Sequence, residues 1–151
     1  MRPDVHLRPA TANDAASLSS LIQATIKISN ARDYSPEVIE RVAANFSQTT
    51  LRALIEKRQI LIALRGDTAV GTASLDHDVV RTVFVHPDEQ GQGIGQSLMV
   101  QIEDLARASG VQSLRVPASL TAEYFYTRLG YSFVKEVFDG DERTIVLEKV
   151  I

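Results

Sequence analysis

The chain of 151 residues contains no cysteine, which excludes disulfide bonds, thiolate metal sites and a cysteine nucleophile. This absence fits a reducing compartment, so we expect a cytoplasmic protein. The three histidines show no paired spacing with carboxylates of the kind found in zinc-binding helices, and no Gly-x-Ser-x-Gly motif is present. We therefore expect neither a metal site nor a serine nucleophile.

Long apolar runs and dense basic segments are also missing. No run of about 18 apolar residues occurs and the N-terminal segment lacks the apolar core of a signal peptide, so we expect no membrane association. With 16 Lys and Arg against 19 Asp and Glu, the formal charge is −3 without a basic cluster, which disfavours a nucleic-acid partner. The composition predicts a compact globular protein, and the length predicts one domain over residues 1–151.

What is present is a mixed order of helices and strands. Thr11 with Asp14, and Ser35 with Pro36, are helix-start signals in a mostly helical first third. Three consecutive strands then predict an antiparallel meander. The predicted strands are 5–8, 60–64, 69–75, 79–85, 113–116, 131–138 and 144–150, and the predicted helices are 11–30, one starting at 36, 50–57, 92–108 and 119–129.

Three glycines occupy every second position between the end of a predicted strand and the start of a predicted helix. They are Gly91, Gly93 and Gly95. Backbone N–H groups are unpaired at such a place and the helix dipole is positive, which suits a phosphate or pyrophosphate group. The alternative is a tight turn, which needs only one or two glycines. A dinucleotide fingerprint fails because Gln96 takes the place of its third glycine, and a P-loop fails because no Gly-Lys-Ser/Thr triplet occurs.

The run from Val83 to Pro87, followed by Gln90-Gly-Gln-Gly-Ile-Gly95, resembles the acyl-CoA-binding motif of the GNAT superfamily of N-acetyltransferases. That motif is Gln or Arg, two residues, Gly, any residue, then Gly or Ala. The segment from Ser119 to Phe133 is similar to a second family pattern, Ser-x-x-Ala-x-x-Phe-Tyr-x-x-x-Gly-Phe, with Tyr131 in place of the more usual Phe. The order of predicted elements extends the resemblance over essentially the whole chain.

The resemblance implies an α/β (α+β) fold with a mixed, mostly antiparallel sheet of six to seven strands, flanked by helices and splayed between the fourth and fifth strands. It implies acetyl-CoA as cosubstrate, with pantetheine on the fourth strand and the pyrophosphate on the glycine loop, and it is consistent with a homodimer. The cofactor-binding residues that it implies are Val83, Phe84, Val85, Gln90, Gly91, Gln92, Gly93, Ile94, Gly95 and Ser119.

The resemblance also implies that Tyr126 is the general acid that protonates the departing CoA thiolate. Tyrosine is protonated at neutral pH because its ordinary pKa is about 10. The alternative is a tyrosine that only packs, and Tyr124 is predicted to be the surface residue of the pair. Ser119 has an alternative as well, since it is a suitable helix cap.

The acceptor site is less defined by sequence. Asp33 and Tyr34 lie in the loop between the first two helices, which borders the acceptor pocket in this family. His77 and Asp78 are further candidates to bind the acceptor, and together with Asp76 and His86 they are candidates for the general base. The alternative is that these polar residues only turn the chain.

Together these observations predict an enzyme that transfers an acetyl group from acetyl-CoA to a primary amine of a small molecule or peptide by direct attack. The alternative is a CoA-sensing or regulatory domain with the same fold and little catalysis, and a weaker one is an interaction module without a ligand. The acidic balance favours a cationic acceptor.

Overall fold

The computed structural model describes residues 4–151, in which seven strands form one sheet in the order β1-β2-β3-β4-β5-β7-β6. Neighbouring strands are antiparallel except for β4 and β5, which are parallel. The expected mixed, mostly antiparallel sheet is therefore confirmed. The strands are β1 (Val5–Pro9), β2 (Gln59–Arg65), β3 (Thr68–Asp76), β4 (Val79–Val85), β5 (Ser113–Ser119), β6 (Ser132–Asp139) and β7 (Glu142–Val150).

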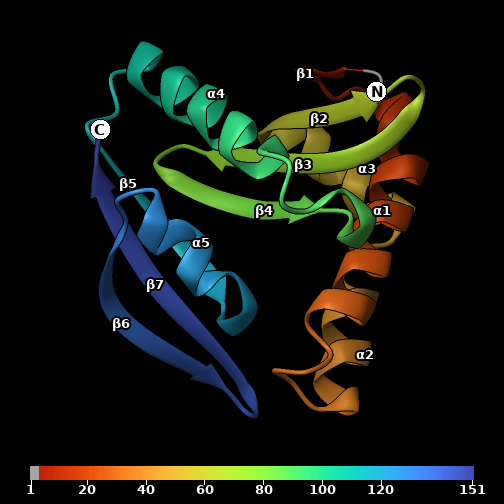
Figure 1. The fold of residues 1–151 in the computed structure, drawn as a ribbon, viewed down its shortest axis with the longest axis vertical. Helices are drawn as coiled ribbons and strands as arrows, with labels where there is room; N and C mark the ends of the chain where they lie inside the picture. The colour runs from red at the N-terminus through yellow and green to blue at the C-terminus, as the bar shows by residue number, and fades with distance from the viewer. Residues whose placement is uncertain (1–3) are drawn as a thin grey trace.

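Helices cover the sheet on both faces, and the molecule consists of two halves (Figure 1). The N-terminal half contains β1 to β4 and the first four helices, and the C-terminal half contains β5 to β7 and the last helix. Across residues 4–151 no helix is long and apolar enough to cross a bilayer. The helices are α1 (Ala15–Ser29), α2 (Pro36–Ala44), α3 (Gln48–Lys57), α4 (Ile94–Ala108) and α5 (Glu123–Arg128), with short 3₁₀ turns at Ala12–Asp14, Pro87–Glu89 and Leu120–Ala122.

The two halves separate between β4 and β5. These strands pair at a single position, Val79 with Arg115, where the Arg115 N–H donates to the Asp78 carbonyl at 3.1 Å. Beyond this point the strands diverge, so residues 81–85 of β4 are only half-buried although β4 is central in the strand order. The expected splay between the fourth and fifth strands is confirmed, and it leaves one edge of β4 facing an opening.

β5 extends to Ser119, beyond the predicted end at Val116, and it contains Pro117. Proline cannot donate to a strand ladder, so its place within a strand needs an explanation. The Arg115 N–H is directed toward β4, and position 117 faces the same way because strand directions repeat every second residue. Pro117 therefore presents its missing N–H to the opening, while Val116 and Ala118 alternate with it in the ladder with β7. The proline does not end the pairing with β7, because its missing N–H lies on the opposite edge of β5, where no strand pairs.

Each face of the sheet carries its own apolar cluster. The stripe of α4, with Leu98, Met99 and Ile102 fully buried, packs on the face that it shares with α5. The stripe of α1, including Leu18 and Ile22, packs on the other face with α3. Both helices bury apolar side chains at the spacing that the sequence shows. The first cluster includes residues of β5 and β7 as well as β2 to β4 and so joins the two halves, whereas the second lies within the N-terminal half.

One charged group lies inside the first cluster. Glu103 of α4 is 7% exposed, and its carboxylate accepts hydrogen bonds from the Tyr131 hydroxyl at 2.9 Å and the Lys149 ammonium at 3.1 Å. A buried carboxylate needs such partners to offset its loss of hydration. This contact explains why a tyrosine is present where the related family pattern has phenylalanine.

Candidate active site

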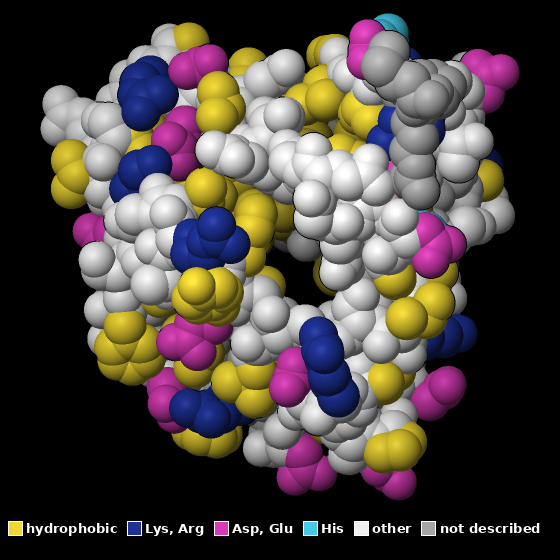
Figure 2. Space-filling view, viewed as in Figure 1, with side chains coloured by type: hydrophobic (Ala, Val, Ile, Leu, Met, Phe, Trp, Pro, Cys, Tyr) yellow, Lys and Arg dark blue, Asp and Glu magenta, His cyan; other side chains and the backbone are white. Residues whose placement is uncertain are grey.

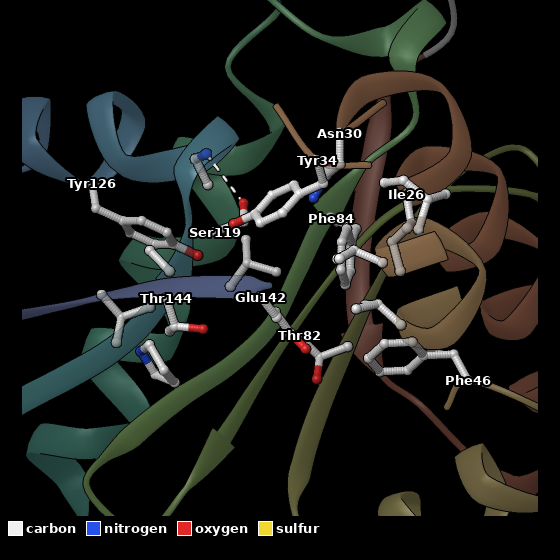
Figure 3. A pocket seen from close by; sticks show the side chains of 18 of the residues that line it. Ile26, Asn30, Tyr34, Phe46, Thr82, Phe84, Ser119, Tyr126, Glu142 and Thr144 are labelled. Carbon is white, nitrogen blue, oxygen red and sulfur yellow. Dashed lines mark hydrogen bonds between the residues drawn. The ribbon is translucent and has the colours of Figure 1, made fainter. Parts of the chain in front are cut away.

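The opening between β4 and β5 holds a cavity of about 180 Å³ (Figures 2 and 3). Figure 2 shows it as a hollow near the centre of the molecule. Its walls come from both halves: α1, α2 and β4 on one side, and β5, α5 and the start of β7 on the other. Residues that are distant in the sequence therefore meet around one space.

The β4 wall of the cavity contains a β-bulge. Arg81 pairs with Ser74 and Phe84 pairs with Thr72, so Thr82 and Val83 both face the single residue Ala73 of β3. Thr82 has a φ of 54°, a left-handed conformation that is strained for a β-branched residue. The bulge lies where β4 parts from β5, and the backbone groups on the open edge are available to an extended amide ligand.

The glycine loop continues from β4 to α4. Gly91 and Gly93 have φ values of 79° and 84°, which favour glycine over any residue with a Cβ atom. The first hydrogen bond within α4 runs from the Ser97 N–H to the Gly93 carbonyl, so the N–H groups of residues 94–96 precede the helical ladder. The positive end of the helix and these amides fit a pyrophosphate group. α4 begins two residues later than predicted because Gly93 is left-handed.

Gly95 has a different role from the two glycines before it. A Cβ atom at this position would lie 3.0 Å from two ring atoms of Phe125 and 3.5 Å from the Val85 side chain. The absence of a side chain therefore lets the first turn of α4 approach α5. This contact connects the glycine loop to the helix that carries Tyr126.

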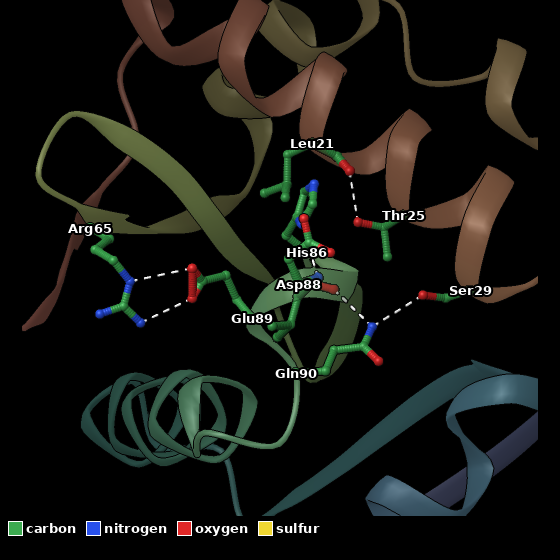
Figure 4. Close-up of polar contacts among 9 residues, drawn as sticks. Leu21, Thr25, Ser29, Arg65, His86, Asp88, Glu89 and Gln90 are labelled. Atoms are coloured by element: carbon green, nitrogen blue, oxygen red, sulfur yellow. Dashed lines mark hydrogen bonds and ion pairs between the residues drawn. The ribbon is translucent and has the colours of Figure 1, made fainter. Parts of the chain in front are cut away.

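Side chains around the loop hold it in place (Figure 4). The Gln90 amide donates to the Val85 carbonyl at 3.0 Å and to the Ser29 hydroxyl at 3.1 Å, which joins the end of β4 to α1. The Arg65 guanidinium contacts Glu89 at 3.0 Å and the Gln92 side chain at 3.0 Å. The side chains of both glutamines thus bond to the protein itself, which leaves the backbone amides as the groups that fit an anion.

Tyr126 contributes to the core and to the cavity at once. Only 3% of the residue is exposed, and its ring meets Phe125 and Tyr131 edge to face at 5.0 and 5.8 Å between centroids. Figure 3 shows its hydroxyl directed into the pocket, and within residues 4–151 that hydroxyl has no hydrogen-bond partner. Burial raises the pKa of Tyr126 well above its ordinary value. The sequence predicts that Tyr126 reaches a cleft rather than the core centre, and the structure places it in both.

The neighbouring candidates on this wall fall where their patterns predict. Tyr124 is 72% exposed and lies beside the Arg128 guanidinium, which confirms it as the surface tyrosine. The Ser119 hydroxyl accepts from the Ala122 N–H at 3.2 Å, as a helix cap does, and the residue also lines the cavity. The cap bond uses one of the two lone pairs of the Ser119 oxygen, so the hydroxyl can still accept a hydrogen bond from another donor.

A link between the two halves closes one side of the cavity. The Tyr34 hydroxyl donates to the Arg143 carbonyl of β7 and accepts from the Leu120 N–H, each at 2.8 Å. Beside it the Thr121 hydroxyl donates to the Asp33 carboxylate at 2.7 Å. Burial raises the pKa of Tyr34, so its hydroxyl keeps its proton at neutral pH. We call Asp33 and Tyr34, with these contacts, the Tyr34 bridge.

His77 and Asp78 lie elsewhere, in the turn between β3 and β4 at the end where β4 still meets β5. The His77 side chain is 93% exposed, and both residues border a separate surface depression with Arg58 and Glu56. Asp76 accepts from Arg81 at 3.2 Å, and the His86 ring accepts from the Asp88 N–H at 3.1 Å. The structure thus brings Tyr34 and Tyr126 together around the cavity, and His77 and Asp78 are not among its lining.

Sequence reasoning did not single out most of the cavity lining, and Thr82 and Glu142 are the two missed residues with the clearest consequences for the site. Thr82 carries no local signal for a bulge, and Glu142 follows an Asp-Gly turn where an acidic residue is ordinary. Only the sheet order brings both to one space. Among residues 4–151, no group of His, Asp and Glu side chains is arranged to hold a metal ion.

Known proteins resemble this chain in sequence and in fold. Residues 30–146 match the sequence model of the family described as the acetyltransferase (GNAT) domain. The chain belongs to the GNAT acetyltransferase family. A crystal structure of a GCN5-related N-acetyltransferase from Rhodopseudomonas palustris superposes with a TM-score of 0.93 at 30% identity and covers 100% of this chain and 98% of that chain.

One further solved structure is similar in fold, and one curated relative is similar in sequence. The PaiA N-acetyltransferase of Thermoplasma acidophilum, solved with coenzyme A, has a TM-score of 0.82 at 20% identity over 98% of this chain and 99% of that chain. The amino-acid acetyltransferase of Ectopseudomonas mendocina is 31% identical over 122 residues, which are 81% of this chain. This chain spans only 26% of that relative's length.

Proposed function

We propose that this protein is an acetyl-CoA-dependent N-acetyltransferase that acts on a primary amine. One observation carries the proposal: β4 runs along the cavity that contains the Tyr126 hydroxyl and leads directly into the glycine loop at the start of α4. A long cosubstrate with an amide-rich arm and a pyrophosphate needs these features in this order. Membership of the GNAT family supports the same function.

The groups that would hold acetyl-CoA are mostly backbone. The open edge of β4 at Val83, Phe84 and Val85 offers donors and acceptors to pantetheine as a neighbouring strand would. The amides of residues 91–96 offer donors to the pyrophosphate, supported by the dipole of α4. When bound, acetyl-CoA supplies a thioester whose acyl group is open to attack by an amine.

Tyr126 is proposed to hold the proton that the departing sulfur needs. With ordinary pKa values of about 10 for tyrosine and about 8.5 for a thiol, the transfer is uphill by roughly 2 kcal/mol. Burial raises the pKa of Tyr126 further, but a thiolate in the same cavity is also poorly hydrated and becomes a stronger base. In this proposal the Tyr126 hydroxyl, which points into the cavity, donates its proton to the sulfur anion of CoA.

The test combines cosubstrate binding with turnover. We expect CoA and acetyl-CoA to raise the melting temperature, and thiol release from acetyl-CoA to require an added amine. Gly93→Asp adds a carboxylate to the anion loop and should abolish the thermal shift. Gly110→Asp is the matched control, since Gly110 has a φ of 85° against 84° for Gly93, and a Cβ atom at either position would have no other atom within 4 Å.

The results separate three functions. A thermal shift without thiol release from any amine indicates a CoA-sensing domain instead of an enzyme. No shift in the unmodified protein indicates a domain that does not bind CoA. Equal loss of the shift in both aspartate variants assigns the effect to backbone strain rather than to the anion loop.

A further inference from the structure

The cavity has an apolar end opposite Tyr126. In Figure 3, Tyr126 lies on one side of the pocket, and Ile26, Phe46 and Phe84 lie on the other. Val38, Ile39 and Val42 of α2 complete this apolar end. The rings of Phe46 and Phe84 meet edge to face with 6.0 Å between centroids. A group bound here exchanges water for apolar side chains.

Charge in the cavity has one sign. Glu142 is the only acidic residue of the lining, and the lining contains no Lys or Arg within the described part of the chain. The Glu142 side chain is 31% exposed, and the Arg41 guanidinium approaches it only to 3.9 Å from a half-exposed position. Tyr34 and Thr144, which are polar but uncharged, also line the space. Glu142 lies in this polar part of the cavity, between the apolar end and Tyr126.

Two further guanidinium groups, those of Arg58 and Arg143, lie near the cavity but outside its lining. The Arg143 guanidinium bonds to the Glu136 carboxylate. The Arg58 guanidinium reaches Thr82 at 3.5 Å from outside the lining, and Asp76 lies 3.9 Å from it and 3.2 Å from Arg81. An acceptor carboxylate in the cavity would therefore meet Glu142 and an apolar wall with no basic lining residue beside it. Burying an unpaired carboxylate in such a place is strongly unfavourable.

We infer that the acceptor is a small primary monoamine with an apolar body and no carboxylate, such as an aralkylamine or alkylamine. Glu142 attracts the ammonium group on entry, and the apolar end of the cavity binds the body, which leaves the amine on the side of Tyr126. This inference rests on the proposed acetyltransferase function and specifies its substrate class. Amino acids, with a carboxylate, and polyamines, with several charges, fit this lining poorly.

The experiment compares matched amines by thiol release from acetyl-CoA. Phenethylamine and phenylalanine share a body and differ by the carboxylate, so we expect kcat/KM to favour phenethylamine by about 100-fold. Along ethylamine, butylamine and hexylamine, kcat/KM should rise by roughly fourfold per methylene until the cavity is full. Spermidine should react more slowly than hexylamine.

Two variants test the roles assigned to Glu142 and to the apolar end of the cavity. Glu142→Gln should raise KM for phenethylamine by about tenfold and leave KM for acetyl-CoA unchanged. The control is Glu148→Gln on the same strand, where the carboxylate pairs with Arg115 away from the cavity. Val42→Phe fills the apolar end and should lower kcat/KM for phenethylamine by about tenfold while changing ethylamine much less.

Preference for phenylalanine or spermidine, or equal effects of the two glutamine variants, overturns the inference and leaves the transferase function in place. Absence of thiol release with every amine overturns the transferase function, and the acceptor class with it. The two failures are therefore distinguishable in one set of assays.

Discussion

Tyr126 packs in the core and is also the residue that we propose as the proton donor. Its ring contacts Phe125 and Tyr131 in the core, and its hydroxyl is directed into the cavity. The hydroxyl oxygen borders the cavity and is not among the fully enclosed polar atoms of residues 4–151. The ring contacts account for the packing of Tyr126, and the proposed proton transfer to sulfur gives the hydroxyl a role.

We predict that Tyr126→Phe lowers kcat by about 100-fold, because phenylalanine keeps the ring contacts and removes only the proton donor. The dissociation constant of acetyl-CoA should stay nearly unchanged, measured by calorimetry. Tyr124→Phe on the exposed face of α5 is the control and should change neither value. Parallel losses of binding and turnover in Tyr126→Phe would instead show that the tyrosine is structural.

At the scale of elements, the loop between α1 and α2 is joined to the opposite half by the Tyr34 bridge. Tyr34 contacts Arg143 and Leu120, which are far from it in the sequence, through a single hydroxyl. Arg41 and Glu142, 3.9 Å apart, form a weaker link beside it. The width of the cavity therefore depends on a tertiary contact, because β4 and β5 do not pair there.

We expect Tyr34→Phe to loosen this side of the cavity. The change removes both hydrogen bonds of the Tyr34 hydroxyl, and it should lower the free energy of unfolding by about 1 kcal/mol, because water replaces the lost partners at a half-open site. KM for the amine should rise while KM for acetyl-CoA stays constant. Thr121→Val removes only the outer bond to Asp33 and should have the smaller effect; a loss of stability with unchanged KM would limit the bridge to a structural role.

At the scale of the whole molecule, two buried tyrosines make stability depend on alkaline pH. Burial raises the pKa of Tyr126, and burial together with the Glu103 carboxylate raises the pKa of Tyr131. A folded-state pKa above the unfolded value means that the folded protein binds more protons at high pH. The stabilisation is complete below pH of about 10, the unfolded value, and is lost as pH rises above it.

The expected result is a fall in the free energy of unfolding above pH of about 10, with a slope approaching roughly 1.4 kcal/mol per pH unit for each tyrosine. Urea titrations at a series of pH values measure it. Tyr126→Phe should reduce the slope, and Tyr124→Phe, which alters an exposed residue, should not. An unchanged slope in Tyr126→Phe would contradict the assigned burial of its hydroxyl.

The sequence by itself determined the local features of this protein. Alternation, caps and turn residues predict the order of strands and helices, and the glycines at 91, 93 and 95 predict a loop suited to an anion, because these patterns follow from local backbone geometry. The motif of Gln90, Gly93 and Gly95 adds the resemblance to the GNAT family. The position of Tyr126 on its helix is also readable from neighbouring residues. Each of these signals acts over a few residues of chain.

Only the tertiary structure decided what surrounds the cavity. The Thr82 bulge arises from register with β3, Pro117 ends no strand because its missing N–H faces the unpaired edge of β5, and Glu142 enters the cavity through the position of β7 in the sheet. The Tyr34 bridge likewise joins residues that are separated along the chain. These features depend on contacts between distant segments, and such contacts leave no periodic pattern in a single sequence.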